Sequence, residues 1–412
     1  MLSWPSKLID PTFDEHPQPL HPTPCVVYGF RACWRHATLG AVIVDQQELE
    51  AVRSAVRSLM RHYDVDYWRR MDETKSFPSE FFDAVGQAGY FGTLIPESHG
   101  GSNAGPRVAS IVVEEINRQG GDAAAINAQM AICGTLVRHG TEQQRAYLSE
   151  IATGRLRCLA VAATESDSGA DMSQLSSTAR REGDAWVISA NKMFISMVEH
   201  TQLLLLLVNT EAGPTLFLVD THTAKAHLEV HPMPMLVNRL TTSLFIDGLE
   251  LPDTARIGEP GAGLDCLMQG FALRRILAAS ESIGNARFLL DKSLEQAKSR
   301  HTFNRPIGQN QGVQYPLAQA FAKVEAADLM RWDALDQLEA GADAGGRSAL
   351  AKILASEAAW ETARAALTAF GGWALASEMH IERKLRECTV FVFNNMLLSY
   401  VAQRVLGLPK AF

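Results

Sequence analysis

The chain has 412 residues and a formal net charge of -8, with 47% apolar and 20% charged residues. This length is enough for two or three domains with sizeable cores, and the composition is that of a globular protein. The mild acidity provides no positive field for a nucleic-acid partner, and no apolar run reaches the roughly 20 residues that a membrane-spanning helix needs. We therefore expect neither nucleic acid nor a membrane among its partners.

The six cysteines are scattered along the chain, and no two of them have the CxxC spacing of a zinc or thioredoxin-like site. This pattern in a large chain is typical of reduced thiols in a cytoplasmic protein. His222, His227 and His231 lie close together in the sequence but without a supporting set of carboxylates, so no metal site is predicted.

Residues 1–44 are rich in proline and show no periodic pattern. Asp10, Asp14 and Glu15 argue against a secretory signal or a transit peptide. We expect a poorly ordered extension; the alternative is an arm that wraps a neighbouring subunit.

The next region, residues 45–156, has helical periodicity throughout, beginning with apolar residues every three or four positions from Leu49 to Leu59. A helix is predicted after Pro78, with Ser76 as its cap. Three more helices are predicted at 106–119, 123–139 and 142–153, the last capped by Thr141. This region should form an all-helical domain.

Residues 157–257 change character. Five short segments are β-branched or aromatic and are separated by Gly, Asp, Asn and Pro: CLAVAAT, DAWVISANKMFIS, LLLLLVNT, PTLFLVD and TTSLFIDGLEL. They predict a central β domain, a small barrel or sandwich.

Residues 258–412 are helical again. One long helix is predicted over 264–299, followed by Ala-rich helices at 317–340 and 347–370 joined by a glycine-rich turn, and by a last helix at 396–406. Long helices with short turns are typical of a four-helix bundle. The expected fold class is therefore α+β: an all-α domain, a β-barrel or sandwich domain, and a helical bundle.

Several blocks of this sequence resemble the acyl-CoA dehydrogenase family over about residues 45–407: IPESHGG, VVEEINR, AATESDSGAD, GDAWVISANKMFIS, RHTFNRPIGQNQ and AFGGWALASEMHIERKLRE. The resemblance implies one non-covalent FAD per subunit and a homotetramer, or at least a homodimer. It also implies an acyl-CoA or acyl-carrier thioester as substrate, and an electron-transfer flavoprotein as a further partner.

The resemblance also assigns residues to the cofactor. Thr164 and Ser196 match donors at the flavin edge, Phe194 matches an aromatic residue that packs on the ring, and Arg300 matches a ligand of the pyrophosphate, because a guanidinium fork suits phosphate. The full set implied for FAD is Val161, Ala163, Thr164, Ala170, Phe194, Ile195, Ser196, Arg300, Phe303, Asn310, Gln311, Thr368, Gly371 and Gly372. Arg274, Arg275 and Ala170 match positions near the substrate, and Ala170 replaces the usual Ser.

The expected catalytic base is missing. The family uses a glutamate a few residues after an Arg-Asp pair, which Arg386–Glu387 matches, and counting onward places Asn395 at the base position. Some members carry the base on the long helix instead, where this chain has Arg274. Glu387 and Glu281 are the nearby carboxylates that remain as substitutes. An asparagine cannot accept a proton at neutral pH, and loss of a positioned base costs roughly 10²–10⁴-fold in rate.

Three hypotheses for function follow. The chain is an FAD-dependent dehydrogenase of the Cα–Cβ bond of an acyl thioester with an atypical base. Alternatively, it is a non-dehydrogenating flavoenzyme of the same fold, resembling a desulfinase, hydroxylase or special desaturase, with a carrier-bound substrate. The third hypothesis is a flavin-binding subunit without turnover.

Overall fold

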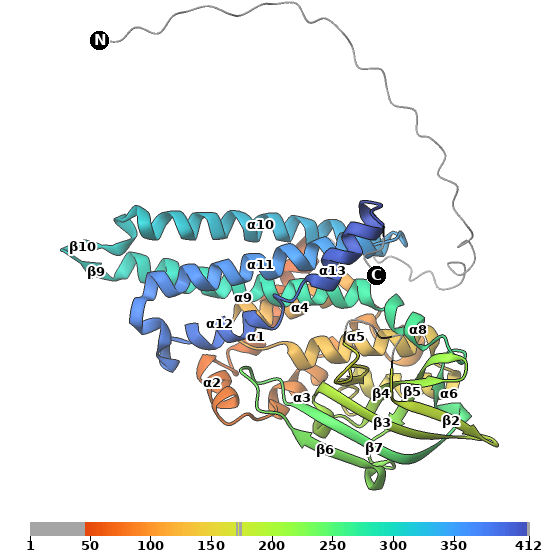
Figure 1. Cartoon of the computed structure of the whole chain (residues 1–412). Coiled ribbons are helices and arrows are strands. Elements are labelled where there is room, and N and C mark those ends of the chain that lie inside the picture. Colours follow the sequence, from red (N-terminus) through yellow and green to blue (C-terminus); the bar gives the residue numbers. More distant parts are fainter. Residues whose placement is uncertain (1–45, 170–171, 173–174, 410–412) are drawn as a thin grey trace, which may run out of the picture. The chain divides into compact units, whose positions relative to one another are not determined.

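The computed structural model describes residues 46–409 except 170–171 and 173–174. The predicted extension over 1–44 therefore lies outside the described residues. The predicted fold class is confirmed: helices, then strands, then helices follow one another along the chain (Figure 1).

The first part is all helical. Its helices are α1 (Gln46–Met60), α2 (Val65–Glu73), α3 (Ser79–Gln87), α4 (Gly105–Arg118), α5 (Ala124–His139), α6 (Glu142–Arg145) and α7 (Leu148–Ala152). Thr141 caps α6 as predicted: its hydroxyl accepts from the Gln144 N–H at 3.2 Å, and its own N–H donates to the Gln144 side chain at 3.0 Å. The predicted cap at Ser76 is wrong, because α3 begins after Pro78 and has no side-chain cap.

The central part is one mixed sheet. Its strands are β1 (Ala160–Ala162), β2 (Thr178–Glu182), β3 (Ala185–Ser196), β4 (Leu203–Thr210), β5 (Gly213–Asp220), β6 (Leu228–Pro232), β7 (Thr241–Pro252) and β8 (Arg256–Ile257). The order is β6-β7-β3-β2-β4-β5-β8, with β1 parallel to β4. Strands β2 and β6 were not predicted: β2 is mostly polar and exposed, and β6 is short, with only Leu228 and Val230 as alternating apolar residues.

Both faces of β4 are buried, which explains its unbroken apolar run. Leu203, Leu205 and Leu207 pack into the core that includes residues of α5, α7 and α8, whereas the alternate residues pack inside the β domain. The sheet is thereby fixed to the helices that precede and follow it.

The last part is a helical bundle. It comprises α8 (Gly263–Gln269), α9 (Phe271–Ser299), the hairpin β9 (His301–Thr302) and β10 (Arg305–Pro306), α10 (Gln311–Glu339), α11 (Gly345–Phe370), α12 (Ile381–Thr389) and α13 (Asn395–Tyr400), which continues as a π-helical turn, Val401–Val405. The prediction of one helix over 264–299 is wrong, since a turn at Gly270 separates α8 from α9; glycine favours a helix less than the residues around it. Within the described ranges, no helix is long and apolar enough to cross a membrane.

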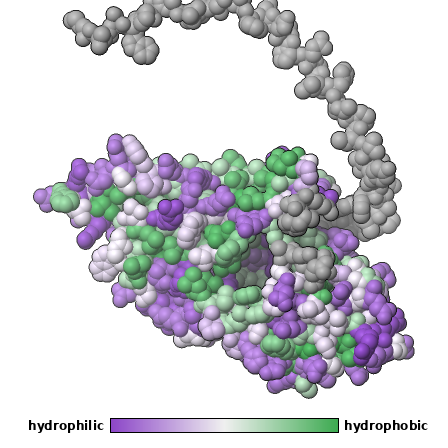
Figure 2. All heavy atoms as spheres, in the orientation of Figure 1, coloured by the Kyte–Doolittle hydropathy of each residue, from purple (hydrophilic) through white to green (hydrophobic). Residues whose placement is uncertain are grey.

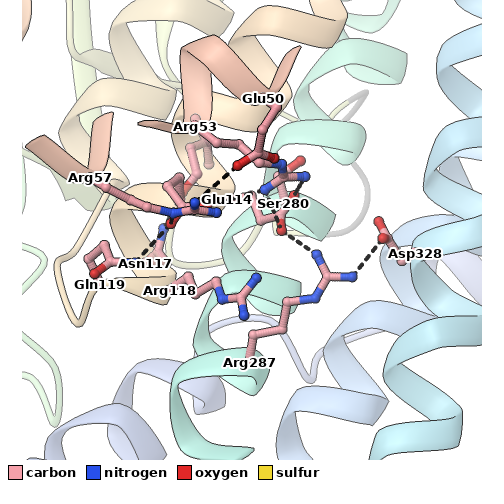
Figure 3. A network of polar contacts seen from close by, with 12 residues as sticks. Glu50, Arg53, Arg57, Glu114, Asn117, Arg118, Gln119, Ser280, Arg287 and Asp328 are labelled. Atoms are coloured by element: carbon pink, nitrogen blue, oxygen red, sulfur yellow. Dashed lines mark hydrogen bonds and ion pairs between the residues drawn. The ribbon is translucent and has the colours of Figure 1, made fainter. Parts of the chain in front are cut away.

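A buried ion cluster joins the first helices to the bundle (Figure 3). Glu114 of α4 is fully buried and contacts Arg53 of α1 at 3.0 Å, Arg331 of α10 at 2.8 Å, and Arg287 of α9. Burial alone would raise the pKa of this carboxyl, but the three guanidinium groups outweigh it and hold the pKa well below its usual range. The carboxylate is therefore ionised, and its removal would leave three arginines without their shared counter-ion.

We expect Glu114→Gln to lower the free energy of unfolding by about 3–5 kcal/mol, because breaking a buried ion cluster leaves uncompensated charge. The control is Glu142→Gln, which breaks an exposed pair with Arg145 and should cost less than about 1 kcal/mol. Urea unfolding followed by circular dichroism measures both. A Glu114→Gln variant as stable as the control would contradict this role.

Candidate functional site

The loop that follows β1 is held by a buried ion pair. The Lys192 ammonium, from β3, donates to Glu165 at 2.7 Å and to the Ala163 carbonyl at 3.3 Å. Glu165 also accepts from the Ser176 N–H at 2.7 Å. Burial opposes ionisation of Glu165, but these hydrogen bonds lower its pKa to about 2. The pair therefore fixes both ends of the loop over residues 163–177.

Thr164 lies at the start of this loop with its donors free. Its carbonyl accepts from the Met193 N–H at 2.9 Å, which ties it to β3. In the described part of the chain, neither its N–H nor its hydroxyl has a hydrogen-bond partner, and the residue is only half-buried. These two donors are thus fixed in place and available to a ligand.

A β-bulge presents Phe194 beside Thr164. The pairing of β3 with β7 shifts by one residue between Lys192 and Ile195, and Phe194 has φ 59°. Its ring is 54% exposed, whereas Ile195 is buried in the β domain. Ser196 is half-buried at the end of the strand. A bulky side chain in left-handed backbone geometry is costly, so an exposed aromatic ring at this position calls for a partner outside the fold.

A small hollow lies between the start of α9, α5 and the end of β1. It is lined by Val161, Phe271, Arg274 and residues of α5 among others. The Arg274 side chain is solvent-exposed and has no hydrogen bond or ion pair to any described residue. The surrounding protein desolvates it and lowers its pKa, while Glu281 opposes that shift. An accessible, unpaired guanidinium in a hollow is suited to an anionic or carbonyl group.

Arg275, the neighbour of Arg274, is engaged by the protein. Its guanidinium lies 4.8 Å from the Tyr400 ring centroid and 5.9 Å from that of Phe271, and it donates to the Gly345 carbonyl at 3.4 Å. It therefore holds the C-terminal segment against α9. Of the two predicted substrate arginines, the structure leaves only Arg274 free.

The remaining predicted flavin residues lie at the other end of α9. Arg300 follows the helix, Phe303 in the hairpin is 98% exposed, and Gly371 and Gly372 follow α11 at the same end of the bundle (Figure 1). Asn310 pairs with Arg305 at 2.8 Å and Thr368 with the Arg364 carbonyl at 3.2 Å, while Gln311 is exposed.

The separation between these two groups follows from helix geometry. Arg274 and Arg300 stand near opposite ends of α9, which at 1.5 Å per residue places them roughly 39 Å apart. Val161 shares the hollow with Arg274 and therefore lies at that end of the helix. The structure thus brings Val161 and Arg274 together, and keeps both away from Arg300. Ala170 lies outside the described residues.

Among the residues that the structure describes, the predicted base position, Asn395, and the predicted substitutes offer no free carboxylate. Asn395 begins α13 and is exposed, whereas Asn394 beside it is buried and accepts from Lys352 at 2.7 Å. Both oxygens of Glu387 are engaged, by Arg383 at 2.5 Å and Lys384 at 2.7 Å. This favours a structural role for Glu387.

Glu281 is also engaged. Asn127 of α5 donates to one oxygen at 2.6 Å, and Arg239 donates to the other at 3.3 Å. Burial raises the pKa of this carboxyl to about 7, against the opposing charge of Arg239. Arg239 in turn pairs with Asp122 at 2.5 Å. The carboxylate is thus built into a cross-link between α5, α9 and the segment before β7.

Sequence reasoning missed the Glu165–Lys192 pair. A signal was present: Ile188, Ala190 and Lys192 share the inward parity of β3, and a lysine at an inward position of a strand needs a buried partner. The sequence gave no indication of the contact between Lys352 and Asn394, because a lysine in an alanine-rich helix usually lies on the exposed face and needs no partner.

Comparisons with known proteins agree with this architecture. Models of the N-terminal, middle and C-terminal domains of acyl-CoA dehydrogenases match residues 46–155, 160–245 and 261–394. The acyl-CoA dehydrogenase FadE12 of Mycobacterium tuberculosis is 31% identical over 90% of this chain and 98% of its own length. The 3-(aryl)acrylate reductase of Clostridium sporogenes is 28% identical over 84% of this chain and 93% of its own.

Two solved structures are similar to this one. The glutaryl-coenzyme A dehydrogenase complex with glutaryl-CoA has a TM-score of 0.82 at 26% identity, covering 89% of this chain and 97% of that one. The prolyl acyl carrier protein oxidase AnaB has a TM-score of 0.83 at 22% identity, covering 88% of this chain and 100% of that one, and shows likeness of fold alone.

We expect Lys192→Met to lower the free energy of unfolding by about 3–5 kcal/mol, because it leaves Glu165 buried without its counter-ion. The double variant Lys192→Met/Glu165→Gln should recover part of that loss, since no charge then remains buried. Arg180→Met, which breaks an exposed pair with Glu182, is the control. Thermal unfolding measures all four proteins, and a double variant no more stable than Lys192→Met would contradict the pairing.

Proposed function

Because the chain belongs to the acyl-CoA dehydrogenase family, we propose that it is an FAD-dependent oxidoreductase acting on the Cα–Cβ bond of an acyl thioester. The observation that carries the proposal is the surface of Thr164, Phe194 and Ser196, with its fixed free donors and exposed ring. FAD, when bound, supplies the acceptor for the hydride that leaves the substrate.

The residues present fit this cofactor. Thr164 and Ser196 offer donors to a polar ring edge, and Phe194 offers an apolar face from a rigid bulge. Gly372, near Arg300, also supports the fit. A side-chain carbon added there would lie within 4 Å of no described residue other than its chain neighbours, so packing against the described residues does not require a glycine. Close approach of something from outside the subunit would account for it.

Arg274 is proposed to bind the substrate. Its free guanidinium lies in the hollow beside Val161, where it would orient a carbonyl or phosphate oxygen of the thioester. Arg275 contributes indirectly, by holding the segment that contains Asn395.

We also propose that a complete cofactor site needs two subunits. Val161 lies in the hollow beside Arg274, which stands roughly 39 Å along α9 from Arg300, more than one FAD molecule spans. Arg300, Phe303 and Gln311 would therefore serve the flavin of a neighbour. Large apolar side chains are exposed on the bundle, among them Tyr315, Phe321, Leu329, Phe393, Met396 and Leu398. Figure 2 shows apolar areas on the surface of the C-terminal helices.

A homotetramer is our proposal for the assembly, with an electron-transfer flavoprotein as a further partner. For the location we propose the cytoplasm, which agrees with the free and buried thiols of Cys133, Cys158, Cys266 and Cys388.

One observation favours a second candidate function. Asn395 and Arg274 occupy the two positions where the sequence comparison expects a base, and the nearby Glu387 and Glu281 are held by other residues. A non-dehydrogenating flavoenzyme of this fold, with a CoA- or carrier-bound substrate that needs no strong base, would have the same site. A flavin-binding subunit without turnover is the remaining alternative.

Anaerobic mixing with saturated acyl-CoAs separates these functions. A dehydrogenase bleaches the flavin absorbance and forms the trans-enoyl thioester, whereas the second function predicts product that requires oxygen or forms without net bleaching.

We expect Asn395→Glu to raise the reduction rate by about 10²–10⁴-fold, because it restores a proton acceptor. Gln87→Glu, an exposed change elsewhere, is the charge-matched control. An Asn395→Glu rate equal to that of the control would show that position 395 is not beside the α-carbon.

The two-subunit site makes a separate prediction. Arg300→Ala should weaken FAD binding by about 10–100-fold, since a charge-assisted hydrogen bond to phosphate contributes about 1.5–3 kcal/mol. The assembly should persist, and Arg347→Ala, which breaks an exposed pair with Asp333, should retain FAD. Titration of the apoprotein with FAD measures both. Unchanged affinity in Arg300→Ala would remove this residue from the site.

A further inference from the structure

The segment 391–395 connects α12 to α13 and includes the position of the expected base. Its backbone is not helical until Asn395, where α13 begins. Phe393 in its middle is 80% exposed, and Met396 and Leu398 just beyond it are about half exposed. The described part of the chain therefore leaves the outer side of this segment open, and its conformation depends on contacts from the inner side.

Lys352 of α11 provides these contacts. Its ammonium donates to the Phe391 carbonyl at 2.6 Å and to the side-chain oxygen of Asn394 at 2.7 Å. The Asn394 amide donates in turn to the hydroxyl of Ser356, which lies one turn further along α11, at 3.1 Å. Asn394 is buried, and both polar groups of its side chain are bonded to the same helix. One lysine thus joins both ends of the segment 391–394 to α11.

The far end of α13 is fixed separately. The Tyr400 ring lies 4.8 Å from the Arg275 guanidinium, and a side-chain carbon added at Gly345 would collide with the Tyr400 hydroxyl. Gly345 and Lys352 are about 10 Å apart along α11, and Asn395 and Tyr400 are about 8 Å apart along α13. Helix α13 therefore runs back along the first two turns of α11, and Asn395 stands at the level of Lys352.

Lys352 lacks a counter-ion within the described ranges, and burial lowers its pKa to about 8. Buried or half-buried acidic side chains of the helices packed against α11 have partners of their own: Glu281 of α9 pairs with Arg239, Asp328 of α10 with Arg331, and Glu387 of α12 with Lys384. A half-buried ammonium without a counter-ion costs free energy that an apolar side chain of similar length does not. Perturbed ionisable groups of this kind gather at functional sites.

We propose that Lys352 is a positioning residue for the base position: it holds the segment 391–394 against α11 and thereby determines where the side chain of residue 395 stands. This inference rests on the proposed function, because it takes residue 395 as the neighbour of the α-carbon of the thioester. Lys352 acts through Asn394. A misplacement of about 1 Å at a reacting group can cost about 10²-fold in rate, so a lysine outside the site can control the reaction.

The test is a double-variant cycle at positions 352 and 395, because a residue that acts through another shows non-additive effects with it. The wild type, Lys352→Met, Asn395→Glu and Lys352→Met/Asn395→Glu are each loaded with FAD and mixed anaerobically with saturated acyl-CoAs in a stopped-flow instrument. Lys352→Met should slow flavin reduction about 10²-fold in the Asn395→Glu protein. It should change the half-saturating thioester concentration, and the rate of the wild type, less than about threefold.

A conservative variant and a control separate this role from a general effect on stability. Lys352→Arg/Asn395→Glu should recover most of the lost rate, because a guanidinium also donates to two acceptors. Lys225→Met/Asn395→Glu, which changes an exposed lysine of the β domain, should be as fast as Asn395→Glu. Hydrogen exchange reports on the segment without turnover: peptides over 391–400 should exchange faster in Lys352→Met and at the wild-type rate in Lys225→Met.

Equal slowing by Lys352→Met with either residue at position 395, or unchanged exchange over 391–400, would overturn the inference. A wild type that reduces its flavin while Asn395→Glu gains no rate would also overturn it, and would leave the proposed function intact. Flavin that no thioester bleaches in any of the four proteins would contradict the proposed function and, with it, the role of Lys352 in catalysis.

Discussion

The length and rigidity of α9 constrain everything else in this protein. This 29-residue helix carries Arg274 beside the β domain at one end and leads to Arg300 at the other. A packed helix does not bend enough to bring its ends together, so Arg274, with Val161 beside it, stays far from Arg300 within one chain. The exposed apolar side chains of the bundle have the same consequence, because they need a partner surface that a single subunit does not supply. These two observations are the basis of our proposal that cofactor binding and subunit assembly depend on each other.

Buried ion pairs recur in this structure, and each of them joins two or more elements of the fold. Glu114 joins the first helices to the bundle, Glu165 and Lys192 hold the loop of Thr164, and Glu281 joins α5 to α9. A buried ion pair contributes little net stability, but breaking it is costly, so such pairs favour a single arrangement of their surroundings. This matters where donors must be fixed before a ligand arrives, as at Thr164.

Much of the fold could be predicted from the sequence, and the reasons are local. Helical periodicity, short β-branched segments and family blocks in the right order predicted the architecture and the family, and both are confirmed. The capping box at Thr141 was predictable because its two partners are three residues apart. The cross-link from Asn127 to Glu281 was not, since 154 residues separate them and no local pattern marks either one. Positions for cofactor and substrate could be named from the sequence, but the choice between Arg274 and Arg275 depended on which side chain the folded protein had already engaged.

The most direct test of the account is flavin content measured together with mass. The purified protein, followed by light scattering and flavin absorbance during serial dilution, should be yellow with one FAD per subunit while it is oligomeric. FAD and assembly should then be lost together, because each cofactor contacts residues of two subunits. A monomer that keeps its full complement of FAD, or an oligomer that takes up no FAD, would contradict the account.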